Sequence, residues 1–289
     1  MTAASAVLPD GRRLAYSEQG DPAGRPLLLL HGTPGSRLQR HPDGELARRA
    51  GVRLVTVDRP GFGLSDPAPG RSLLDWADDV TVLAAELGLE RFSVAGVSGG
   101  GAFALACAQR LPARIERVLL VSCPAPPAPG SRTGLRPAQR LQFLLAARAP
   151  WLLRLVFASH FRAARNLTPA AVRSRLQQEL PTAEKQCLGL PGFTEMLLAD
   201  SLEAGRQGAA ATTLELALIA RPWNIPLEDI AVPVHLWQGD ADDTVSPAMA
   251  DYLAATIPGC TATIIAGAGH LLGFTHWEEL LAAAAAPPG

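Results

Sequence analysis

The sequence predicts an α/β fold in which a mostly parallel, doubly wound central sheet has an antiparallel N-terminal edge and an inserted all-helical segment. Short continuous apolar runs, typical of strands covered on both faces, alternate with stretches of helical periodicity. This alternation stops at a proline-rich stretch over residues 123–130 and resumes only near residue 232. We therefore expect a core formed by residues 1–124 and 231–289, interrupted after its sixth strand by a helical insert over residues 125–230.

The first elements form the predicted antiparallel edge. Two short strands flank the turn at Pro9-Asp10-Gly11, and the apolar runs 26–31 and 52–58 follow as buried strands. The other elements expected before the insert are a helix over 37–50, a helix over 73–87, a strand over 91–95, a helix over 102–111 and a strand over 115–122. Because crossovers between parallel strands are right-handed, these units predict helices on both faces of the sheet.

The helical insert shows apolar residues at helical spacing in four stretches, and no strand is expected in it. These stretches are 139–147, 151–165, 169–180 and 209–220. The core then continues with a strand over 232–237, a helix over 247–257, a strand over 262–266 and a helix over 272–285.

The composition excludes several classes of partner. The chain has 289 residues, 48% hydrophobic and 18% charged, with a net charge of −1, so bulk charge predicts no nucleic-acid partner and no membrane partner. The four cysteines are far apart and suit small buried hydrophobic positions rather than disulfides or a metal site. No signal sequence and no apolar run near the roughly 18 residues of a membrane span is evident, so we expect a cytoplasmic protein.

The most informative motif is Gly96-Val97-Ser98-Gly99-Gly100, which follows the predicted strand over 91–95 and precedes a helix. A serine at such a corner is exposed only if the backbone takes a positive φ. Gly96 and Gly100 remove the side chains that would collide with it. Because a helix N-terminus also favours negative charge, the pattern predicts a nucleophilic serine at position 98.

Two other interpretations of this motif stay open. Gly96-x-x-Gly99-x-Gly101 has the glycines of a dinucleotide-binding loop, which needs an acidic residue at the end of the next strand. The strand over 115–122 has its only acid, Glu116, at its start instead. The motif can also be a structural turn without chemistry. We prefer the nucleophile to the nucleotide site.

A serine hydroxyl needs a base to take its proton and an acid to orient that base. In a parallel sheet the loops after the strand ends meet at one edge, so these partners should follow later strands. His270 follows the strand over 262–266 in a glycine-rich loop and is our candidate base. The candidate acids are Asp240, Asp242 and Asp243, which crowd the turn after the preceding strand.

Together these motifs resemble the α/β-hydrolase superfamily, in which the catalytic residues run in the order serine, acid, histidine. The resemblance covers roughly residues 7–124 and 231–286. Beside the serine motif it rests on His31-Gly-Thr-Pro-Gly35, Asp58-Arg-Pro-Gly-Phe-Gly-Leu-Ser65, Gly239-x-x-Asp242 and Gly269-His270. It implies Asp242 as the acid, three residues after a glycine that ends the strand, and leaves Asp240 and Asp243 as turn or cap residues.

The resemblance also implies an oxyanion hole, whose N–H donors point at the oxygen that becomes negative in the transition state. The Gly99 N–H is one donor, and the loop over residues 31–35 should provide the other. Pro34 has no N–H, so Thr33 is the first choice and Gly32 the second. The residues expected to support these loops are His31, Gly32, Gly96 and Gly100.

The resemblance further implies that the helical insert covers the site as a lid. Its large apolar residues can line an apolar pocket, although such residues more often hold the helices of an insert together. They are Phe143, Trp151, Leu152, Phe157, Phe161, Phe193 and Trp223. Nine arginines lie from Arg132 to Arg175, before the first acid of the insert, Glu179. They either attract an anionic substrate or, in a chain whose only lysine is Lys185, form solvated helix surface.

These observations predict a serine hydrolase, without cofactor or metal, that cleaves an ester, lactone, thioester or amide of a small molecule through an acyl-enzyme. Alternatives are carbon–carbon cleavage, acyl transfer or cyclisation by the same residues, and a non-catalytic ligand-binding protein. The loop over residues 31–35 is similar to that of proline iminopeptidases and related esterases. However, Gly99 stands after the serine, where those peptidases usually have a bulky residue. An epoxide hydrolase or dehalogenase is disfavoured because such enzymes have aspartate at the position of Ser98.

Overall fold

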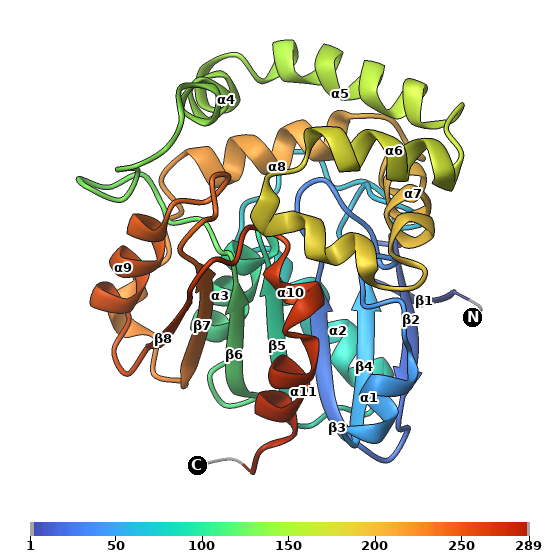
Figure 1. Cartoon of the computed structure of the whole chain (residues 1–289). Coiled ribbons are helices and arrows are strands. Elements are labelled where there is room, and N and C mark those ends of the chain that lie inside the picture. Colours follow the sequence, from blue (N-terminus) through green and yellow to red (C-terminus); the bar gives the residue numbers. More distant parts are fainter. Residues whose placement is uncertain (1–2, 288–289) are drawn as a thin grey trace.

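The structure is a computed structural model that describes residues 3–287, and it confirms the predicted α/β class. Within that range eight strands form one sheet in the order β1-β2-β4-β3-β5-β6-β7-β8 (Figure 1). β1 (Ala4–Val7) and β4 (Val52–Val57) both pair antiparallel with β2 (Arg13–Gly20). All other neighbours pair in parallel, namely β3 (Arg25–Leu30), β4, β5 (Phe92–Val97), β6 (Ile115–Val121), β7 (Val234–Gly239) and β8 (Thr261–Ile265).

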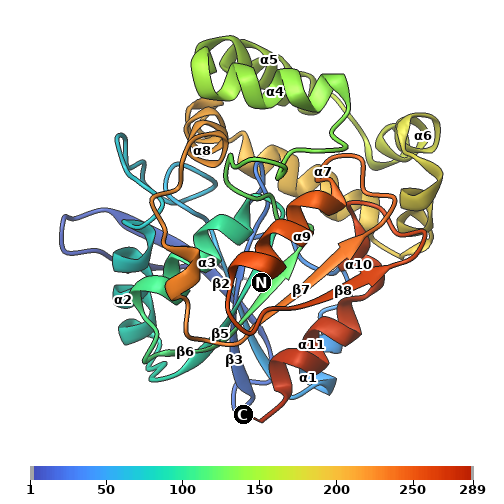
Figure 2. The same ribbon diagram turned by 90° about the vertical axis from the view of Figure 1, so that its left-hand side faces the viewer.

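Helices cover both faces of the sheet, as Figure 2 shows. One face packs against α2 (Trp76–Glu86), α3 (Gly100–Arg110) and α9 (Pro247–Thr256), and the other against α1 (Glu45–Arg49) and α11 (Trp277–Ala285). The side chains of β3 alternate between the two faces. Leu28 and Leu30 belong to the first apolar cluster, whereas Leu27 and Leu29 belong to the second. Burial on both faces therefore explains the continuous apolar runs in the sequence.

Two predicted helices differ from the structure. The helix predicted over 37–50 is reduced to α1, because Asp58 holds the preceding loop: its carboxylate accepts hydrogen bonds from the backbone N–H (2.6 Å) and side chain (2.6 Å) of Arg37. The helix predicted over 272–285 is divided into α10 (Leu272–Thr275) and α11. The division falls at His276, whose φ of −115° is not helical.

The helical insert contains the four predicted helices and elements that the sequence did not predict. The predicted ones correspond to α4 (Pro137–Arg148), α5 (Pro150–Ala164), α6 (Pro169–Glu179) and α8 (Ala210–Ala220). The others are the 3₁₀ helix η1 (Thr182–Gly189), α7 (Phe193–Ala204) and the short 3₁₀ helix η2 (Leu227–Asp229). Figures 1 and 2 show α4 to α8 above the carboxyl ends of the parallel strands. The insert therefore lies over the edge where binding sites form in such sheets.

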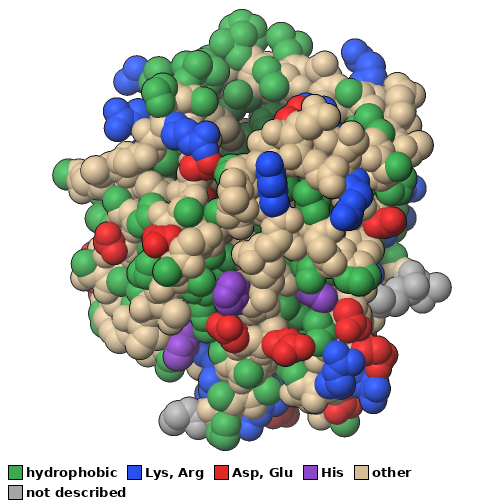
Figure 3. Space-filling view, in the orientation of Figure 1, with side chains coloured by type: hydrophobic (Ala, Val, Ile, Leu, Met, Phe, Trp, Pro, Cys, Tyr) green, Lys and Arg blue, Asp and Glu red, His purple; other side chains and the backbone are tan. Residues whose placement is uncertain are grey.

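The outer surface of α4 and α5 carries several exposed apolar side chains. Figure 3 shows hydrophobic side chains gathered over these helices at the top of the molecule. The side chains concerned are at least 45% exposed and are Leu141, Leu144, Trp151, Leu155 and Val156. Between residues 3 and 287 no single helix is long and apolar enough to cross a membrane. Helices α4 and α5 have that length and hydropathy only when taken together, and they are bent by 117° at their junction.

A buried cluster of charges joins the insert to the core. Glu215, on α8, is fully buried and pairs with Arg59 (2.6 Å) and Arg71 (2.8 Å). Burial raises the pKa of Glu215, but the charge and hydrogen bonds of Arg59, with the charge of Arg71, more than offset this effect and leave the pKa at about 2. Arg59 also donates hydrogen bonds to the carbonyl oxygens of His31 and Gly32. One carboxylate of the insert thus balances two buried guanidinium groups of the core.

We expect Glu215→Ala to lower the free energy of unfolding by about 3–5 kcal/mol, because it leaves two guanidinium groups without their counter-charge in a site of low dielectric constant. Glu179→Ala is the control: it removes an exposed ion pair with Arg175, and its effect should stay below about 0.5 kcal/mol. Urea unfolding followed by circular dichroism measures both. Equal and small losses in the two variants would contradict a stabilising role of the buried cluster.

Candidate active site

Ser98 lies at the corner between β5 and α3 and has a φ of 49°. This left-handed conformation is uncommon for a residue with a side chain and costs on the order of 1–3 kcal/mol. A Cβ atom on Gly96 would lie 2.6 Å from the carbonyl oxygen of Gly100, and one on Gly100 would collide with the carbonyl oxygen of Leu30. The positive φ and the close backbone packing that the motif predicts are therefore both present.

Three loops bring Ser98, His270 and Asp242 together. The Nε2 atom of His270 lies 3.1 Å from Ser98 Oγ, and its Nδ1 atom lies 2.9 Å from Asp242 Oδ2. Both distances are those of hydrogen bonds. The three residues follow β5, β8 and β7, so each stands at the carboxyl end of the sheet. This arrangement allows a proton to move from Ser98 to His270 while Asp242 accepts the hydrogen bond from Nδ1.

The Asp242 carboxylate is held by the turn in which it lies. Its Oδ1 atom accepts hydrogen bonds from the backbone N–H groups of Thr244 and Val245, each at 2.9 Å, and Oδ2 accepts one from the Gln238 side chain at 3.0 Å. Burial raises the pKa of Asp242, but the charge of His270 and these backbone hydrogen bonds more than offset it. The pKa therefore lies below its ordinary value, and the group is ionised at neutral pH.

The two neighbouring aspartates have other partners. Asp240 accepts a hydrogen bond from the backbone N–H of Gly267 at 2.7 Å and so links the loops after β7 and β8. Asp243 pairs with Arg136, just before α4. Of the three candidate acids, Asp242 is the one that the structure places against the ring of His270.

His270 is influenced by two carboxylates, one of which the sequence analysis missed. Burial lowers its pKa, but Asp242 and, with a smaller contribution, Glu184 raise it further, so the pKa lies above its ordinary value. Glu184 belongs to η1 of the insert and is 4% exposed. Its Oε1 atom accepts a hydrogen bond from the backbone N–H of His270 at 2.5 Å, and Oε2 accepts one from Leu271 at 2.8 Å. No local pattern connects residues 86 positions apart, so only the fold reveals this contact.

Two backbone N–H groups beside Ser98, those of Thr33 and Gly99, are candidate oxyanion donors. Within residues 3–287 neither the Thr33 N–H nor the Gly99 N–H donates to a protein acceptor. The loops that carry them touch, since a Cβ atom on Gly99 would lie 2.6 Å from Thr33 Oγ1. The second choice for the oxyanion donor, Gly32, is wrong for a physical reason: its N–H already donates to Oε1 of Gln39 at 2.5 Å.

The loop over residues 31–35 is supported from the core and from the insert. His31 is buried, and burial together with the charge of Arg59 holds its pKa well below the ordinary value, so the ring is neutral. Its Nδ1 atom donates to the Gly32 carbonyl oxygen at 2.7 Å, and its Nε2 atom accepts from the Arg59 N–H at 3.2 Å. Thr33 Oγ1 donates to Glu215 at 2.7 Å. The loop therefore has one anchor in each part of the molecule.

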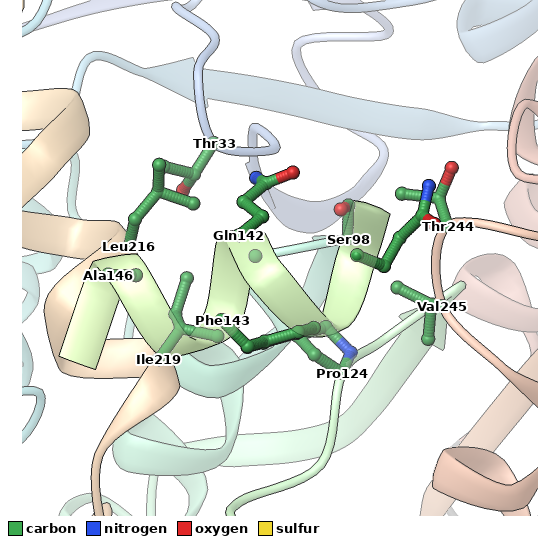
Figure 4. A pocket seen from close by; sticks show the side chains of 12 residues that line it. Thr33, Ser98, Pro124, Gln142, Phe143, Ala146, Leu216, Ile219, Thr244 and Val245 are labelled. Carbon is green, nitrogen blue, oxygen red and sulfur yellow. The ribbon is translucent and has the colours of Figure 1, made fainter. Parts of the chain in front are cut away.

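Two cavities adjoin Ser98. The first contains about 530 Å³ of empty space including its open part, and Figure 4 shows Ser98 at its wall with Phe143 and Ile219 nearby. Its lining is Thr33, Ser98, Gly99, Pro124, Gln139, Gln142, Phe143, Ala146, Leu216, Ile219, Thr244 and Val245. The second, of about 680 Å³ on the same measure, is lined by Gly32, Thr33, Pro34, Gln39, Arg40, Val97, Ser98, His270, Leu271, Gly273, Phe274 and Trp277. Helices α4 and α8 of the insert thus form part of the first cavity.

Few of the large apolar residues of the insert line a cavity beside Ser98, as expected if most of them hold its helices together. Of the seven candidates, Phe143 lines the first cavity. Phe161 and Phe193 are instead buried in separate apolar clusters, Trp223 belongs to the core cluster, and Trp151 is 64% exposed. These side chains join helices to one another or face outward. Helical spacing alone does not say which neighbour an apolar stripe contacts, so the sequence could not assign these contacts.

The family model of the alpha/beta hydrolase fold matches residues 25–276, and the chain therefore belongs to this family. A proline iminopeptidase from Xylella fastidiosa (strain 9a5c) is 34% identical over 118 residues, which cover 38% of this chain and 36% of that protein. A 2-hydroxymuconate semialdehyde hydrolase from Pseudomonas putida is 34% identical over 119 residues, covering 40% and 41%. The matches thus span less than half of each relative.

A solved structure shares this fold over the whole length of the chain. The chain is similar to an esterase from Rhodococcus sp. ECU1013 with a TM-score of 0.70 and 21% identity, over 100% of both chains. At this level of identity the similarity concerns the fold, which extends through the insert as well as the core.

We expect the His270 ring to titrate above the ordinary histidine pKa of about 6.5, because carboxylate charge outweighs burial. Asp242→Asn removes the nearer charge and should lower this pKa, whereas Asp240→Asn, whose carboxylate binds Gly267 instead, should leave it unchanged. Proton NMR titration of the ring measures all three proteins. The same His270 pKa in both variants would contradict the assignment of Asp242 as its partner.

Proposed function

We propose that this protein is a serine hydrolase that cleaves a carboxylic ester, lactone, thioester or amide of a small molecule through an acyl-enzyme. The observation that carries the proposal is the hydrogen-bonded series Ser98, His270 and Asp242. Beside it lie the N–H groups of Thr33 and Gly99, which donate to no acceptor within residues 3–287. A nucleophile, a base, an acid and two oxyanion donors thus share one edge of the sheet. This is the set of groups that acyl transfer requires.

In the proposed mechanism, Ser98 Oγ attacks the carbonyl carbon while its proton passes to His270 Nε2. Asp242 accepts the Nδ1–H hydrogen bond and balances the imidazolium. The Thr33 and Gly99 N–H groups stabilise the oxyanion, each by about 3 kcal/mol. The intermediate then collapses, and the leaving group departs with the proton from His270. Water attacks the acyl-enzyme with His270 as base, which releases the acid and restores Ser98.

The first cavity favours an uncharged substrate with an apolar part. The first is lined mainly by apolar side chains such as Phe143, Leu216 and Ile219, and the helical insert acts as its lid. No acidic side chain is among the residues that line either cavity, so a charged substrate amine has no carboxylate to bind there. This favours an ester over an aminopeptidase substrate. None of the nine arginines from Arg132 to Arg175 lines either cavity. This favours the interpretation that they form solvated helix surface over the one that they bind an anionic substrate.

Carbon–carbon bond hydrolysis is the second candidate. The observation that favours it is the similarity to a protein named 2-hydroxymuconate semialdehyde hydrolase, because a compound of that name has no ester or amide bond to hydrolyse. Both candidate reactions use Ser98 and His270, so the site residues do not distinguish them. Activity toward different substrates does. A non-catalytic ligand-binding role is the third candidate, but ligand binding alone does not require a serine that is hydrogen-bonded to a histidine.

Hydrolysis of p-nitrophenyl esters of increasing acyl length tests the proposal. We expect turnover by the native protein, and a loss of at least about a thousandfold in Ser98→Ala, because the nucleophile is removed. Ser174→Ala, at an exposed position of α6, should keep full activity. Equal turnover in the native protein and Ser98→Ala would contradict the proposal. If the native protein hydrolyses no ester but cleaves a carbon–carbon bond of a vinylogous 1,5-diketone, the second candidate is favoured.

A further inference from the structure

The carboxylate of Glu184, in the helical insert, binds the backbone of the loop that carries His270. Glu184 accepts hydrogen bonds with both of its oxygens, one from His270 N–H and one from Leu271 N–H. The contact is so close that a Cβ atom on Gly269 would collide with the carboxylate. Charge-assisted hydrogen bonds to two successive N–H groups form a bidentate clamp on the backbone.

This loop needs an anchor because its own sequence does not provide one. Gly267, with a φ of 70°, and Gly269 flank Ala268, and glycine has the largest backbone freedom to lose on folding. The ring of His270 is held at its nitrogens by Ser98 and Asp242, and its carbonyl oxygen accepts a hydrogen bond from Ser122 Oγ at 3.2 Å. The N–H side of the backbone is held by Glu184, which accepts from His270 and Leu271. A displacement of about 1 Å at a reacting group can cost about a hundredfold in rate.

We propose that Glu184 is a positioning residue that holds the His270 backbone so that Nε2 faces Ser98, and that the insert thereby completes the catalytic arrangement. The inference rests on the proposed function. Glu184 lines neither cavity, so its effect on the reaction runs through His270 rather than through contact with substrate.

The charge of Glu184 adds a second effect to the geometric one. The charged groups that act on His270 are Asp242, from the loop after β7, and Glu184, from η1. Both raise the pKa of His270 against the lowering effect of burial. Glu184 therefore also favours the imidazolium that forms when His270 takes the proton of Ser98.

Two substitutions separate geometry from charge. Glu184→Gln keeps the shape but removes the charge and sets an amide N–H₂ against one backbone N–H. We expect kcat to fall about 10- to 100-fold with little change in KM, and the acid limb of the kcat/KM profile to move to lower pH. Glu184→Asp keeps the charge on a shorter side chain, so kcat should fall while the acid limb stays near its native position. Glu179→Gln, an exposed acid on α6, is the control and should match the native protein.

Ester hydrolysis by the full chain, with unfolding curves for each variant, gives these values. The inference is overturned if folded Glu184→Gln, or Glu184→Asp should the first variant fail to fold, has the kcat and pH profile of Glu179→Gln. NMR titration of His270 separates this failure from that of the proposed function. A native protein without activity, but with a His270 pKa that falls in Glu184→Gln, contradicts the proposed function alone. Native activity with no change of kcat or of this pKa in the variant contradicts only the role of Glu184.

Discussion

The hydrogen bond between His270 Nε2 and Ser98 Oγ is the contact on which the rest of the site depends, and it joins residues 172 positions apart. Ser98 follows β5 and His270 follows β8, with β6 and β7 between them. At a strand spacing of about 4.8 Å these loops start roughly 14 Å apart. The loop after β8 must therefore reach back across the sheet edge. Its glycines permit this path, and contacts from elsewhere must hold it there.

The core provides some of these contacts, such as the hydrogen bond from Gly267 N–H to Asp240, and the insert provides others. Glu184 holds the loop of His270, and Glu215 binds Thr33 and Arg59 beneath the opposite side of the site. Asp200, on α7, accepts hydrogen bonds from Ser36 at 2.6 Å and from Gln39 at 3.2 Å. Burial of a carboxylate lowers the stability of the fold unless the group has hydrogen-bond or ion-pair partners. Each of these three carboxylates has such partners in a loop of the core. The seating of the insert and the geometry of the loops are thus coupled.

The sequence predicted those features that follow from local rules. The strands were visible because each is covered on both faces, and the turn at Ser98 was visible because only glycines fit around it. The positions of His270 and Asp242 followed from the strand order and the resemblance. The contacts of Glu184 and Glu215 were not predicted, because they connect distant segments without any shared spacing. For the same reason the sequence did not show that Gln39 occupies the Gly32 N–H or that Asp58 keeps residues 37–44 from forming a helix.

The central claim is that Ser98 is a nucleophile activated by His270. Covalent labelling with a fluorophosphonate, followed by peptide mass spectrometry, tests it most directly, because this reagent reacts with activated serines and needs no knowledge of the substrate. We expect one label per chain, on the peptide that contains Ser98, with a labelling rate that falls as His270 becomes protonated. Folded protein that stays unlabelled, or that carries the label on another serine, would contradict it.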